Sequence, residues 1–445
     1  MKKFFKILFL ILIISSPAFG DDFQDDTIIR DSEIEETLKS YISPLFKVAG
    51  LSPETLKIHL IVNKQVNAMA SIGYQLFLFT GFLLEAKNVG QVIGVLAHET
   101  GHIADGHIER MIGHGEKMMA ISVAHLLLGA AAAVAGSPEA GVAIGMGGVG
   151  VAQNEFLHYH RGQEAAADQD ALRYLDKLGW SAKGLDEFLT ILLKQEYLSS
   201  SRQDPYLRTH PLTRERVETV KRYLQLSKFT NAPFPKGFER KFQLMQAKLL
   251  SFLYPAKALG VYDAADTSVA ARYARAIAYY RLQDLTKSLD LLDELIKEEP
   301  HNPYFWELKA QILFENGKIQ ECLSTYEKAV HLAPHASLIK IQYAHALIEA
   351  NDPTNFTKAE TLLNAAYSKE SENTLLWHLL AILYGRRQEE GLMCLALAEE
   401  GFLRGDPKVA KYQANRAIQK LKKNSVHWIR AQDLLSQVKQ EENEK

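Results

Sequence analysis

The sequence predicts a mainly α-helical fold with a small β-sheet (α+β) in its first half and an α-helical solenoid of repeated helix pairs in its second half. Three observations support this fold class. Apolar residues recur at helical spacing along most of the chain, short runs rich in branched residues occur between residues 56 and 80, and a 34-residue period appears beyond about residue 240. With 445 residues, the chain is long enough for two or three domains.

The chain begins with MKKFFKILFLILIISSPAFG, in which lysines precede an apolar run and the small residues Ala18 and Gly20 precede two aspartates. This pattern predicts a secretory signal peptide over residues 1–20 that is cleaved near Gly20, and an uncleaved membrane anchor is the alternative. Because the apolar run is short for a membrane span, we expect cleavage and export. Cleavage removes three lysines and no acid, so the net charge falls from −2 to −5. An acidic chain argues against nucleic acid as a partner.

The first half alternates between helical and extended patterns. Three short runs favour strands, and Ile72-Gly73 between the second and third of them indicates a hairpin turn. The other apolar residues fall at helical spacing. The predicted elements are, in order, a helix over residues 32–47 that Pro44 kinks or ends, strands over 56–62, 66–71 and 74–80, and helices over 91–113, 154–178, 183–198 and 212–226.

Residues 118–153 form a long apolar segment that contains one acid, Glu139, and no lysine or arginine. Its first half is about 18 mostly apolar residues long, which is marginal for a membrane span, and Gly136-Ser137-Pro138 interrupts it. Two alternatives stay open. The segment is an apolar helical hairpin packed on the core, or a surface that borders the active groove or makes a peripheral membrane contact. In neither case do we expect it to span a bilayer.

The second half carries an internal repeat. Pro300 and Pro334 lie 34 residues apart, and Trp306, Gly317 and Tyr326 precede Pro334 as a bulky opening residue, a small turn residue and a second-helix residue. A 34-residue helix pair of this kind is the tetratricopeptide pattern, whose pairs stack because one pair cannot bury its own apolar face. Further pairs are predicted over residues 337–368, 374–402 and 407–439.

The copy that ends at Pro300 is less regular, because Gln283 replaces its turn glycine. A segment with two prolines and a glycine, FTNAPFPKG at residues 229–237, separates the repeats from the first half. We therefore predict two domains after the signal peptide, over residues 21–235 and 240–440.

The chain has two cysteines, Cys322 and Cys394, and both fall in predicted repeat helices. So few cysteines exclude a disulfide framework and leave open a single bridge. An exported chain of this length does not need disulfides, because it can bury sizeable cores.

The stretch LAHETGHIADGH, residues 96–107, concentrates three histidines and two acids on a predicted helix. His98 and His102 are four residues apart, so both imidazoles project from one helix face and can bind the same metal. Glu99 lies beside them, where it can accept a proton from water. Two histidine ligands, a third protein ligand and an open position for water are the arrangement of zinc hydrolases. The alternative is a pair of partly buried histidines without a metal.

A third ligand is expected downstream, in RGQEAAAD at residues 161–168. Glu164 can supply it, and Asp168, one turn later, can accept the second ring N–H of a ligand histidine. Arg161, one turn earlier, can screen these carboxylates, and three consecutive alanines allow another helix to approach closely. The alternative is a solvated acidic helix face.

A further histidine, His210, precedes Pro211 in RTHPLTRER, so its backbone is kept out of the helical region at the start of the next helix. From such a loop it can stabilise the oxyanion of a hydrolytic reaction or bind the metal in a resting state, and an ordinary loop histidine is the alternative. On a continuous helix, His107 faces about 180° away from His98. We therefore interpret His107 as a surface residue or as a residue that supports a metal ligand.

The motifs occur in the order Asn67-Ala68, His98-Glu99-Thr100-Gly101-His102, Glu164 with Asp168, and Thr209-His210-Pro211 with Arg216, followed by the repeats. In this combination the chain resembles the periplasmic members of the HtpX/BepA-type zinc metallopeptidases, which join a gluzincin catalytic domain to a C-terminal tetratricopeptide domain. The resemblance covers essentially the whole chain after the signal peptide. The chain departs from the family at Met69, where an aromatic residue is frequent, which affects a groove wall and not the chemistry.

For the site, the resemblance implies one zinc ion per chain and catalysis by Glu99. It implies that Glu164 is the third zinc ligand, beside His98 and His102, and that His210 is a mobile histidine near the metal and a possible fourth ligand. Further residues of the implied site are Arg216 in the motif of His210, Asp168 beside a ligand, and Asn67 and Ala68 in the substrate groove.

For function, the resemblance implies a periplasmic zinc endopeptidase with a chaperone-like role in the quality control and assembly of outer-membrane β-barrel proteins. Its partners would be unfolded or stalled outer-membrane proteins and, through the repeats, the β-barrel assembly machinery. The alternative is a repeat-based binding scaffold or chaperone with a latent peptidase domain. Because Glu99, both histidines and Glu164 are all present, we favour the active endopeptidase.

Overall fold

The computed structural model describes residues 27–111, 113, 119, 159–195, 206 and 210–443. The predicted signal peptide, Thr209 and, apart from residue 119, the apolar segment at residues 118–153 lie outside the described residues. Within the described part of the chain, no helix combines the length and the apolar character needed to cross a membrane.

The chain divides into two compact units. One comprises residues 35–246 and is called the mixed unit, because it combines helices and strands. The other comprises the residues up to 34 together with residues 247–445, and it is called the repeat unit. The domain boundaries expected from the sequence, at residues 235 and 240, stay a prediction.

Helix α1 (Ser32–Val48) covers the first predicted helix. Pro44 lies inside it and does not end it, although a proline removes one backbone hydrogen bond. Leu38 and Tyr41 on its apolar face are fully buried, and such tertiary packing outweighs local helix propensity. The short 3₁₀ helix η1 (Pro53–Thr55) follows.

Three strands of the mixed unit form a sheet. They are β2 (Lys57–Val62), β3 (Ala68–Ser71) and β4 (Gln75–Phe79). β4 pairs in parallel with β2 and antiparallel with β3, so β3 lies at an edge. In the predicted hairpin turn between β3 and β4, Gly73 and Tyr74 adopt φ values of +76° and +58°, a conformation that glycine enters without strain.

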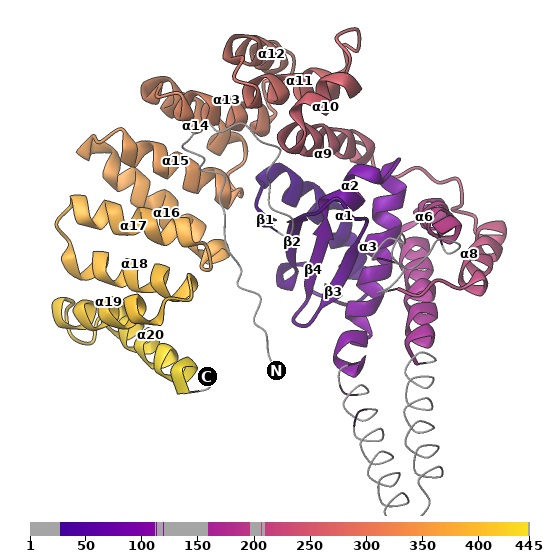
Figure 1. The fold of residues 1–445 in the computed structure, drawn as a ribbon, viewed down its shortest axis with the longest axis horizontal. Coiled ribbons are helices and arrows are strands. Elements are labelled where there is room, and N and C mark those ends of the chain that lie inside the picture. Colours follow the sequence, from indigo (N-terminus) through magenta and orange to yellow (C-terminus); the bar gives the residue numbers. More distant parts are fainter. Residues whose placement is uncertain are drawn as a thin grey trace, which may run out of the picture. The chain divides into compact units, whose positions relative to one another are not determined.

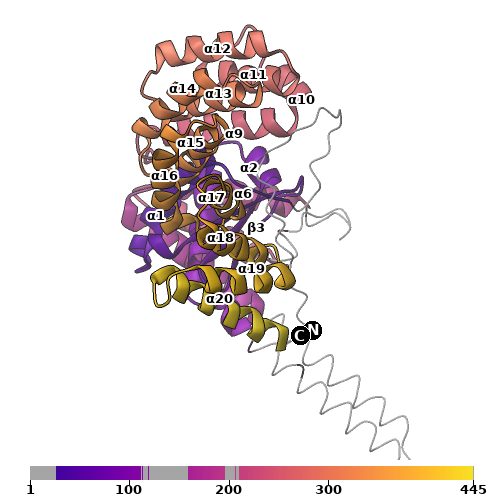
Figure 2. The ribbon, with the colours of Figure 1, turned by 90° about the vertical axis from the view of Figure 1, so that its left-hand side faces the viewer.

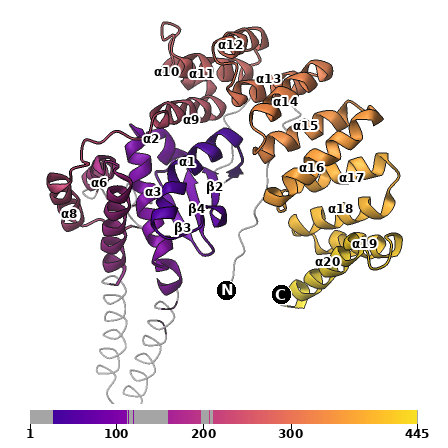
Figure 3. The ribbon, with the colours of Figure 1, turned by 180° about the vertical axis from the view of Figure 1, so that it is seen from behind.

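Helix α3 (Val89–Ala104) lies beside β3 (Figure 3). The sequence predicted a continuous helix to residue 113, but α3 ends earlier. Asp105 and Gly106 form a turn, with a φ of +60° at Gly106, and a second helical stretch covers residues 107–111. The predicted helix breaks at this point because glycine adopts the left-handed conformation at little cost.

Glycines allow two helices to pack closely on α3. A Cβ atom on Gly94 would lie 2.7 Å from a backbone nitrogen of α6 (Lys183–Gln195). A Cβ atom on Gly101 would lie 3.0 Å from the carbonyl oxygen of Ala167 in a helix over residues 159–178. The three helices therefore approach at distances that larger residues would prevent. The mixed unit also contains α2 (Thr80–Glu85) and α8 (Arg214–Leu226).

The repeat unit begins with the short strand β1 (Thr27–Ile29), and its helices form consecutive pairs that stack on one another (Figures 1 and 2). The three pairs predicted after Pro334, over residues 337–368, 374–402 and 407–439, are each present as two consecutive helices. From residue 238 onward the helices are α9 (Phe238–Leu253), α10 (Pro255–Val261), α11 (Val269–Arg281), α12 (Leu285–Glu298), α13 (Pro303–Glu315), α14 (Ile319–Leu332), α15 (Ser337–Glu349), η2 (Pro353–Asn355), α16 (Phe356–Glu370), α17 (Thr374–Arg386), α18 (Glu390–Leu403), α19 (Pro407–Lys420) and α20 (Val426–Asn443).

The turns between paired helices repeat one backbone conformation. Gln283, Gly317 and Asn351 have φ values of +65°, +72° and +51°. Each lies 34 positions after the one before it, which matches the period read from the sequence. Gln283 therefore adopts the left-handed turn of its repeat even though it has a side chain, which explains why the irregular copy still folds as a helix pair.

A cluster of charged side chains is buried in the repeat unit around Lys248. The Lys248 Nζ atom lies 2.7 Å from Asp31 Oδ2, 3.3 Å from Glu33 Oε2 and 3.7 Å from Glu307 Oε2. The Tyr273 hydroxyl donates a hydrogen bond to Glu33 at 2.8 Å. Burial raises the pKa of Glu307 to about 7, against the opposing effect of the Lys248 charge.

Cys322 in α14 and Cys394 in α18 are buried and free. The single disulfide that the sequence left open is therefore not formed. Burial raises the pKa of the Cys322 thiol to about 11 and also raises the pKa of Cys394. Both thiols consequently stay protonated and unreactive while their helices are packed.

Candidate metal centre

The buried part of α3 positions three side chains that the sequence singled out. His98, Glu99 and His102 are at most 4% exposed. The two imidazoles project from one face of the helix, as their four-residue spacing predicts. The helix over residues 159–178 places Glu164 opposite them, and the close contact at Gly101 brings the two helices near enough for their side chains to meet.

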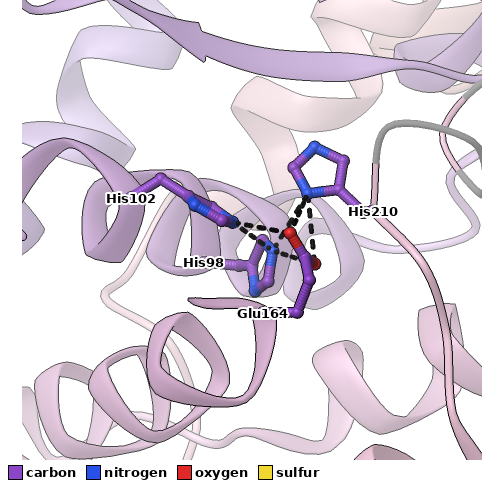
Figure 4. A group of neighbouring side chains, drawn as sticks. All are labelled: His98, His102, Glu164 and His210. Atoms are coloured by element: carbon purple, nitrogen blue, oxygen red, sulfur yellow. Dashed lines mark hydrogen bonds and ion pairs between the residues drawn. The ribbon is translucent and has the colours of Figure 1, made fainter. Parts of the chain in front are cut away.

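Four side chains converge on one point (Figure 4). His98 Nε2 lies 3.1 Å from His102 Nε2 and 3.4 Å from Glu164 Oε2. His102 Nε2 lies 3.3 Å from Glu164 Oε1. His210 Nδ1 lies 3.2 Å from Glu164 Oε1 and 3.4 Å from His98 Nε2. One ligand atom from each residue thus lies within 4.8 Å of the other three.

These separations fit a tetrahedral zinc site. Donor atoms about 2.0–2.1 Å from Zn²⁺ at tetrahedral angles lie about 3.3–3.4 Å from one another. Imidazole nitrogens with one carboxylate suit zinc, whereas magnesium and calcium prefer sites made of oxygen atoms. Lone pairs that face one another in a buried place also need a cation or a proton between them. The chemistry of the donor set therefore agrees with a bound zinc ion.

Asp168 and Arg216 support the converging residues. Asp168 Oδ1 lies 2.9 Å from His98 Nδ1, the ring nitrogen opposite the point of convergence. The Arg216 guanidinium donates to both Asp168 oxygens, at 2.6 and 3.0 Å, and to Glu164 Oε2 at 2.8 Å. Burial disfavours the charged form of Asp168, but the Arg216 charge outweighs it and lowers the pKa of Asp168 to about 2. Burial likewise opposes ionisation of Glu164, and the electrostatic interaction with His210, together with hydrogen bonds from His102, His210 and His98, outweighs it and holds the pKa of Glu164 well below its usual value.

Arg161 does not contribute in the way the sequence suggested. Its side chain is exposed, and the guanidinium that contacts Glu164 and Asp168 belongs to Arg216. The expectation rested on one helical turn of separation from Glu164, and spacing along one helix does not show which residue of another helix points inward.

The segment before α8 places His210 in the cluster. The His210 backbone N–H donates to the Tyr206 carbonyl oxygen at 2.7 Å, and the two rings stack with centroids 4.4 Å apart. The Pro211 carbonyl oxygen accepts a hydrogen bond from Arg216 Nη1 at 2.9 Å. The guanidinium that holds the carboxylates therefore also holds the backbone beside His210. Sequence reasoning missed Tyr206, and an aromatic residue in an otherwise polar stretch of the sequence was the available signal.

Glu99 is fully buried next to the cluster but is not one of the converging donors. Its Oε2 atom accepts a hydrogen bond from the Ala70 backbone N–H in β3 at 2.8 Å. Its Oε1 atom has no hydrogen-bond partner among the described residues and lies 3.5 Å from His210 Nε2. Burial raises the pKa of Glu99. Asn67 and Ala68, the expected groove residues, are also buried.

His107 lies against the cluster and not on the surface. Its ring is 3% exposed, and its Nδ1 atom lies 3.0 Å from His102 Nδ1. The surface interpretation of His107 is therefore wrong. It assumed a continuous helix, and the turn at Gly106 brings the ring back beside α3.

Comparison with known families finds two matches in the chain. Residues 32–224 match peptidase family M48. Residues 282–391 match the cytochrome c-type biogenesis protein H TPR domain. The first match contains all four converging residues, and the second falls within the stacked helix pairs.

Several named proteins are similar to this chain, over most of its length or over part of it. The beta-barrel assembly-enhancing protease of Escherichia coli K12 is 23% identical over 396 residues, which cover 84% of this chain and 76% of that protein. A Vibrio cholerae protein that carries the same name provisionally is 26% identical over 404 residues, or 88% of this chain and 80% of that protein. The human mitochondrial metalloendopeptidase OMA1 is 29% identical over 100 residues, or 22% of this chain and 19% of that protein.

Proposed function

We propose that this chain, a peptidase family M48 metallopeptidase with tetratricopeptide repeats, is a zinc endopeptidase that cleaves unfolded or stalled outer-membrane β-barrel proteins in the periplasm. The observation that carries the proposal is the convergence of four buried side chains, among which His98, His102 and Glu164 place donor atoms at the separations of a tetrahedral metal site. The repeats serve as the surface that binds substrates or the assembly machinery.

His98, His102 and Glu164 would hold the zinc ion. When bound there, zinc polarises a peptide carbonyl and makes water more acidic. Glu99 is then the general base. Its Oε2 atom is anchored by the Ala70 backbone, which leaves Oε1 to accept a proton. Asp168 holds the His98 ring in one orientation, and Arg216 holds Asp168 and Glu164 in place.

The position of β3 supports the proposal that the substrate binds in an extended conformation. β3 lies at an edge of the sheet, and its Ala70 is in direct contact with Glu99. An edge strand binds extended polypeptide through backbone hydrogen bonds. A closed β-barrel has no free strand edge, so an unfolded barrel protein can bind in this way and a folded one cannot. Asn67 and Ala68, the expected groove residues, lie at the start of this edge strand.

The periplasmic role in outer-membrane protein assembly rests on two further supports. Proteins that are similar over most of this chain are named beta-barrel assembly-enhancing proteases. The first twenty residues have the pattern of a secretory signal peptide.

The test is a cleavage assay on the purified chain with zinc, using one outer-membrane β-barrel protein either unfolded in urea and diluted or folded in detergent. We expect cleavage of the unfolded form only. Glu99→Gln should retain zinc and lose about 10²–10⁴-fold in turnover, because general-base catalysis typically contributes that much. The matched control is Glu85→Gln, which changes an exposed carboxylate and should leave turnover unchanged. Near wild-type turnover in Glu99→Gln would overturn the assignment.

The zinc assignment is tested by metal analysis of the same preparation. We expect one zinc per chain, and loss of the metal in His102→Ala. Substoichiometric zinc in the gently purified wild type, together with an unchanged metal content in His102→Ala, would refute the proposed ligands.

His210 is proposed to switch the site between two states. Its Nδ1 atom lies at ligand distance from the other donors, and a zinc ion with four protein ligands is closed to water. In the open state His210 leaves the ligand position and instead stabilises the developing oxyanion. The same geometry favours the second candidate function, a repeat-based chaperone whose peptidase domain is latent.

His210→Ala separates these roles. Loss of a closing ligand should raise the cleavage of normally spared substrates, whereas loss of an oxyanion donor should lower turnover by up to about 10²–10³-fold. We expect the first result, with zinc retained. A variant with wild-type zinc content, resting activity and turnover would leave His210 without a role. A chain that cleaves no unfolded barrel protein with or without His210 would favour the chaperone.

A further inference from the structure

His107 occupies a position that the predicted continuous helix could not give it. After the turn at Gly106, the chain re-enters a helix at His107, and the imidazole is buried against the His102 ring with centroids 5.0 Å apart. The His107 carbonyl oxygen accepts a hydrogen bond from Gln163 Nε2 at 3.0 Å. Gln163 immediately precedes Glu164, so the two helices that supply the metal donors also hold His107.

The contact between the two rings determines where their protons lie. The Nδ1 atoms of His102 and His107 are 3.0 Å apart, so one must donate and the other must accept. His102 directs Nε2 at the point where the donors converge. A neutral imidazole that offers Nε2 to a metal carries its hydrogen on Nδ1. His102 Nδ1 is then the donor, and His107 Nδ1 is the acceptor.

His107 must then carry its own hydrogen on Nε2. That atom lies 3.5 Å from Asp105 Oδ2, in the turn between the two helical stretches. A chain of groups therefore runs from Asp105 through His107 to His102. The contact at His102 parallels the contact of Asp168 with His98. The group that accepts the hydrogen bond from His102 is a neutral ring, whereas His98 faces a carboxylate.

We propose that His107 is a positioning residue for the metal ligand His102, which it holds in the Nδ1–H tautomer and in the orientation that presents Nε2 to the metal. The inference rests on the proposed function, because it takes His102 to be a metal ligand. Residues that orient a metal-binding histidine typically contribute 10–100-fold in metal affinity. The two histidine ligands of this site thus have different supports, an anionic one for His98 and a neutral one for His102.

The test compares two substitutions in the full chain. His107→Asn retains an acceptor, Oδ1, close to the position of the imidazole Nδ1, whereas His107→Leu fills the space without one. We expect His107→Leu to raise the zinc dissociation constant about 10–100-fold, measured by competition with a chromophoric chelator, and to change the visible spectrum of the Co²⁺ form. His107→Asn should stay within about threefold of wild type on the same argument.

The matched control is His59→Leu in β2, a histidine of the same unit outside the metal cluster, which should leave the dissociation constant unchanged. Equal zinc affinity in wild type and a folded His107→Leu would overturn the inference. So would a folded His107→Asn that binds zinc as weakly as His107→Leu. A wild type that binds no metal would instead overturn the proposed function.

A second measurement needs no variant and stays decisive if His107→Leu does not fold. Long-range ¹H–¹⁵N correlation on the zinc-loaded chain with ¹⁵N-labelled histidine assigns the proton on each imidazole. We expect the hydrogen on Nδ1 of His102 and on Nε2 of His107. A hydrogen on Nδ1 of His107 would contradict the proposed tautomers and the inference with them.

Discussion

The mixed unit and the repeat unit each bury a cluster of charged side chains, and the two clusters differ in the source of their positive charge. In the repeat unit, the Lys248 ammonium lies among Asp31, Glu33 and Glu307. In the mixed unit, the four donor atoms of His98, His102, Glu164 and His210 face one another. Within the described residues, no ammonium occupies their meeting point, and the Arg216 guanidinium forms an ion pair with Glu164 alone among the four.

The difference separates a structural cluster from a binding site. A buried carboxylate is costly unless a cation or a proton compensates it. The repeat unit carries its own cation at the centre, so nothing further has to bind. The mixed unit compensates Glu164 and Asp168 from one side through Arg216 and directs its four donors at a separate point, where a cation from outside can bind.

The largest expected effect comes from removing the internal cation. Lys248→Met leaves buried carboxylates without their ammonium, and breaking a buried ion pair in this way costs about 3–5 kcal/mol in the free energy of unfolding. Urea denaturation of the full chain measures it. The control is Lys287→Met, which removes an exposed ion pair with Asp284 and should have a much smaller effect on stability, because water and salt screen such pairs. Equal stabilities of the two variants would remove the basis of the comparison.

The second prediction is a pH dependence in the repeat unit. The pKa of Glu307 is raised from 4.5 to about 7 in the folded chain, so the folded state binds more protons than the unfolded state between these pH values. The stability that this proton contributes is complete below about pH 4.5 and is lost as the pH rises through about 7. It amounts to about 3 kcal/mol.

Glu307→Gln cannot titrate, so its stability should fall less than that of the wild type between pH 4.5 and 7.5. The control, Glu327→Gln, changes an exposed carboxylate and should follow the wild-type curve. Urea denaturation at several pH values measures the difference. Parallel curves for wild type and Glu307→Gln would show that Glu307 does not carry this dependence.

The third prediction removes the external cation from the mixed unit. Chelation of the proposed metal should lower the stability of the mixed unit by about 2.7 kcal/mol if the metal had been present at about 100 times its dissociation constant. Hydrogen exchange should accelerate in residues 98–102 and 159–168 and stay unchanged in α13 to α18. Equal acceleration in both units would mean that the metal does not act through the converging donors.

The smallest expected effect concerns the turns. Gly106 in the mixed unit and Gly317 in the repeat unit adopt left-handed conformations as glycines, whereas Gln283 does so with a side chain. Gln283→Gly should therefore stabilise the repeat unit by up to about 1 kcal/mol, and Gly317→Ala should destabilise it by a similar amount. Thermal denaturation of both variants checks the signs, and a less stable Gln283→Gly would contradict the argument.

Much of the architecture could be predicted because it depends on local periodicity. Helical spacing located α1, α6 and α8, and the 34-residue period between Pro300 and Pro334 located the repeats. The family resemblance is confirmed by the match to peptidase family M48. The residues singled out for the metal site lie together in the structure, because the i, i+4 spacing of His98 and His102 determines their common face.

The errors and omissions arise where contacts join distant parts of the chain. His107 depends on one left-handed residue, Gly106, which broke the predicted helix. Arg216 takes the position expected of Arg161 because it reaches the carboxylates from another helix. The cluster around Lys248 joins residues more than 200 positions apart, such as Asp31 and Glu307, and no periodic pattern relates them.

The two buried thiols allow the opening of helix pairs in the repeat unit to be measured by alkylation. Cys322 and Cys394 are the only cysteines of the chain, and both belong to the repeat unit. A small alkylating reagent can reach them only when α14 or α18 opens, so the rate at which each is labelled reports the opening of its own helix pair. The mixed unit contains no cysteine, so the reagent does not label it. Mass spectrometry of the unmodified sequence can thus follow the opening of these two helix pairs when a candidate substrate is added.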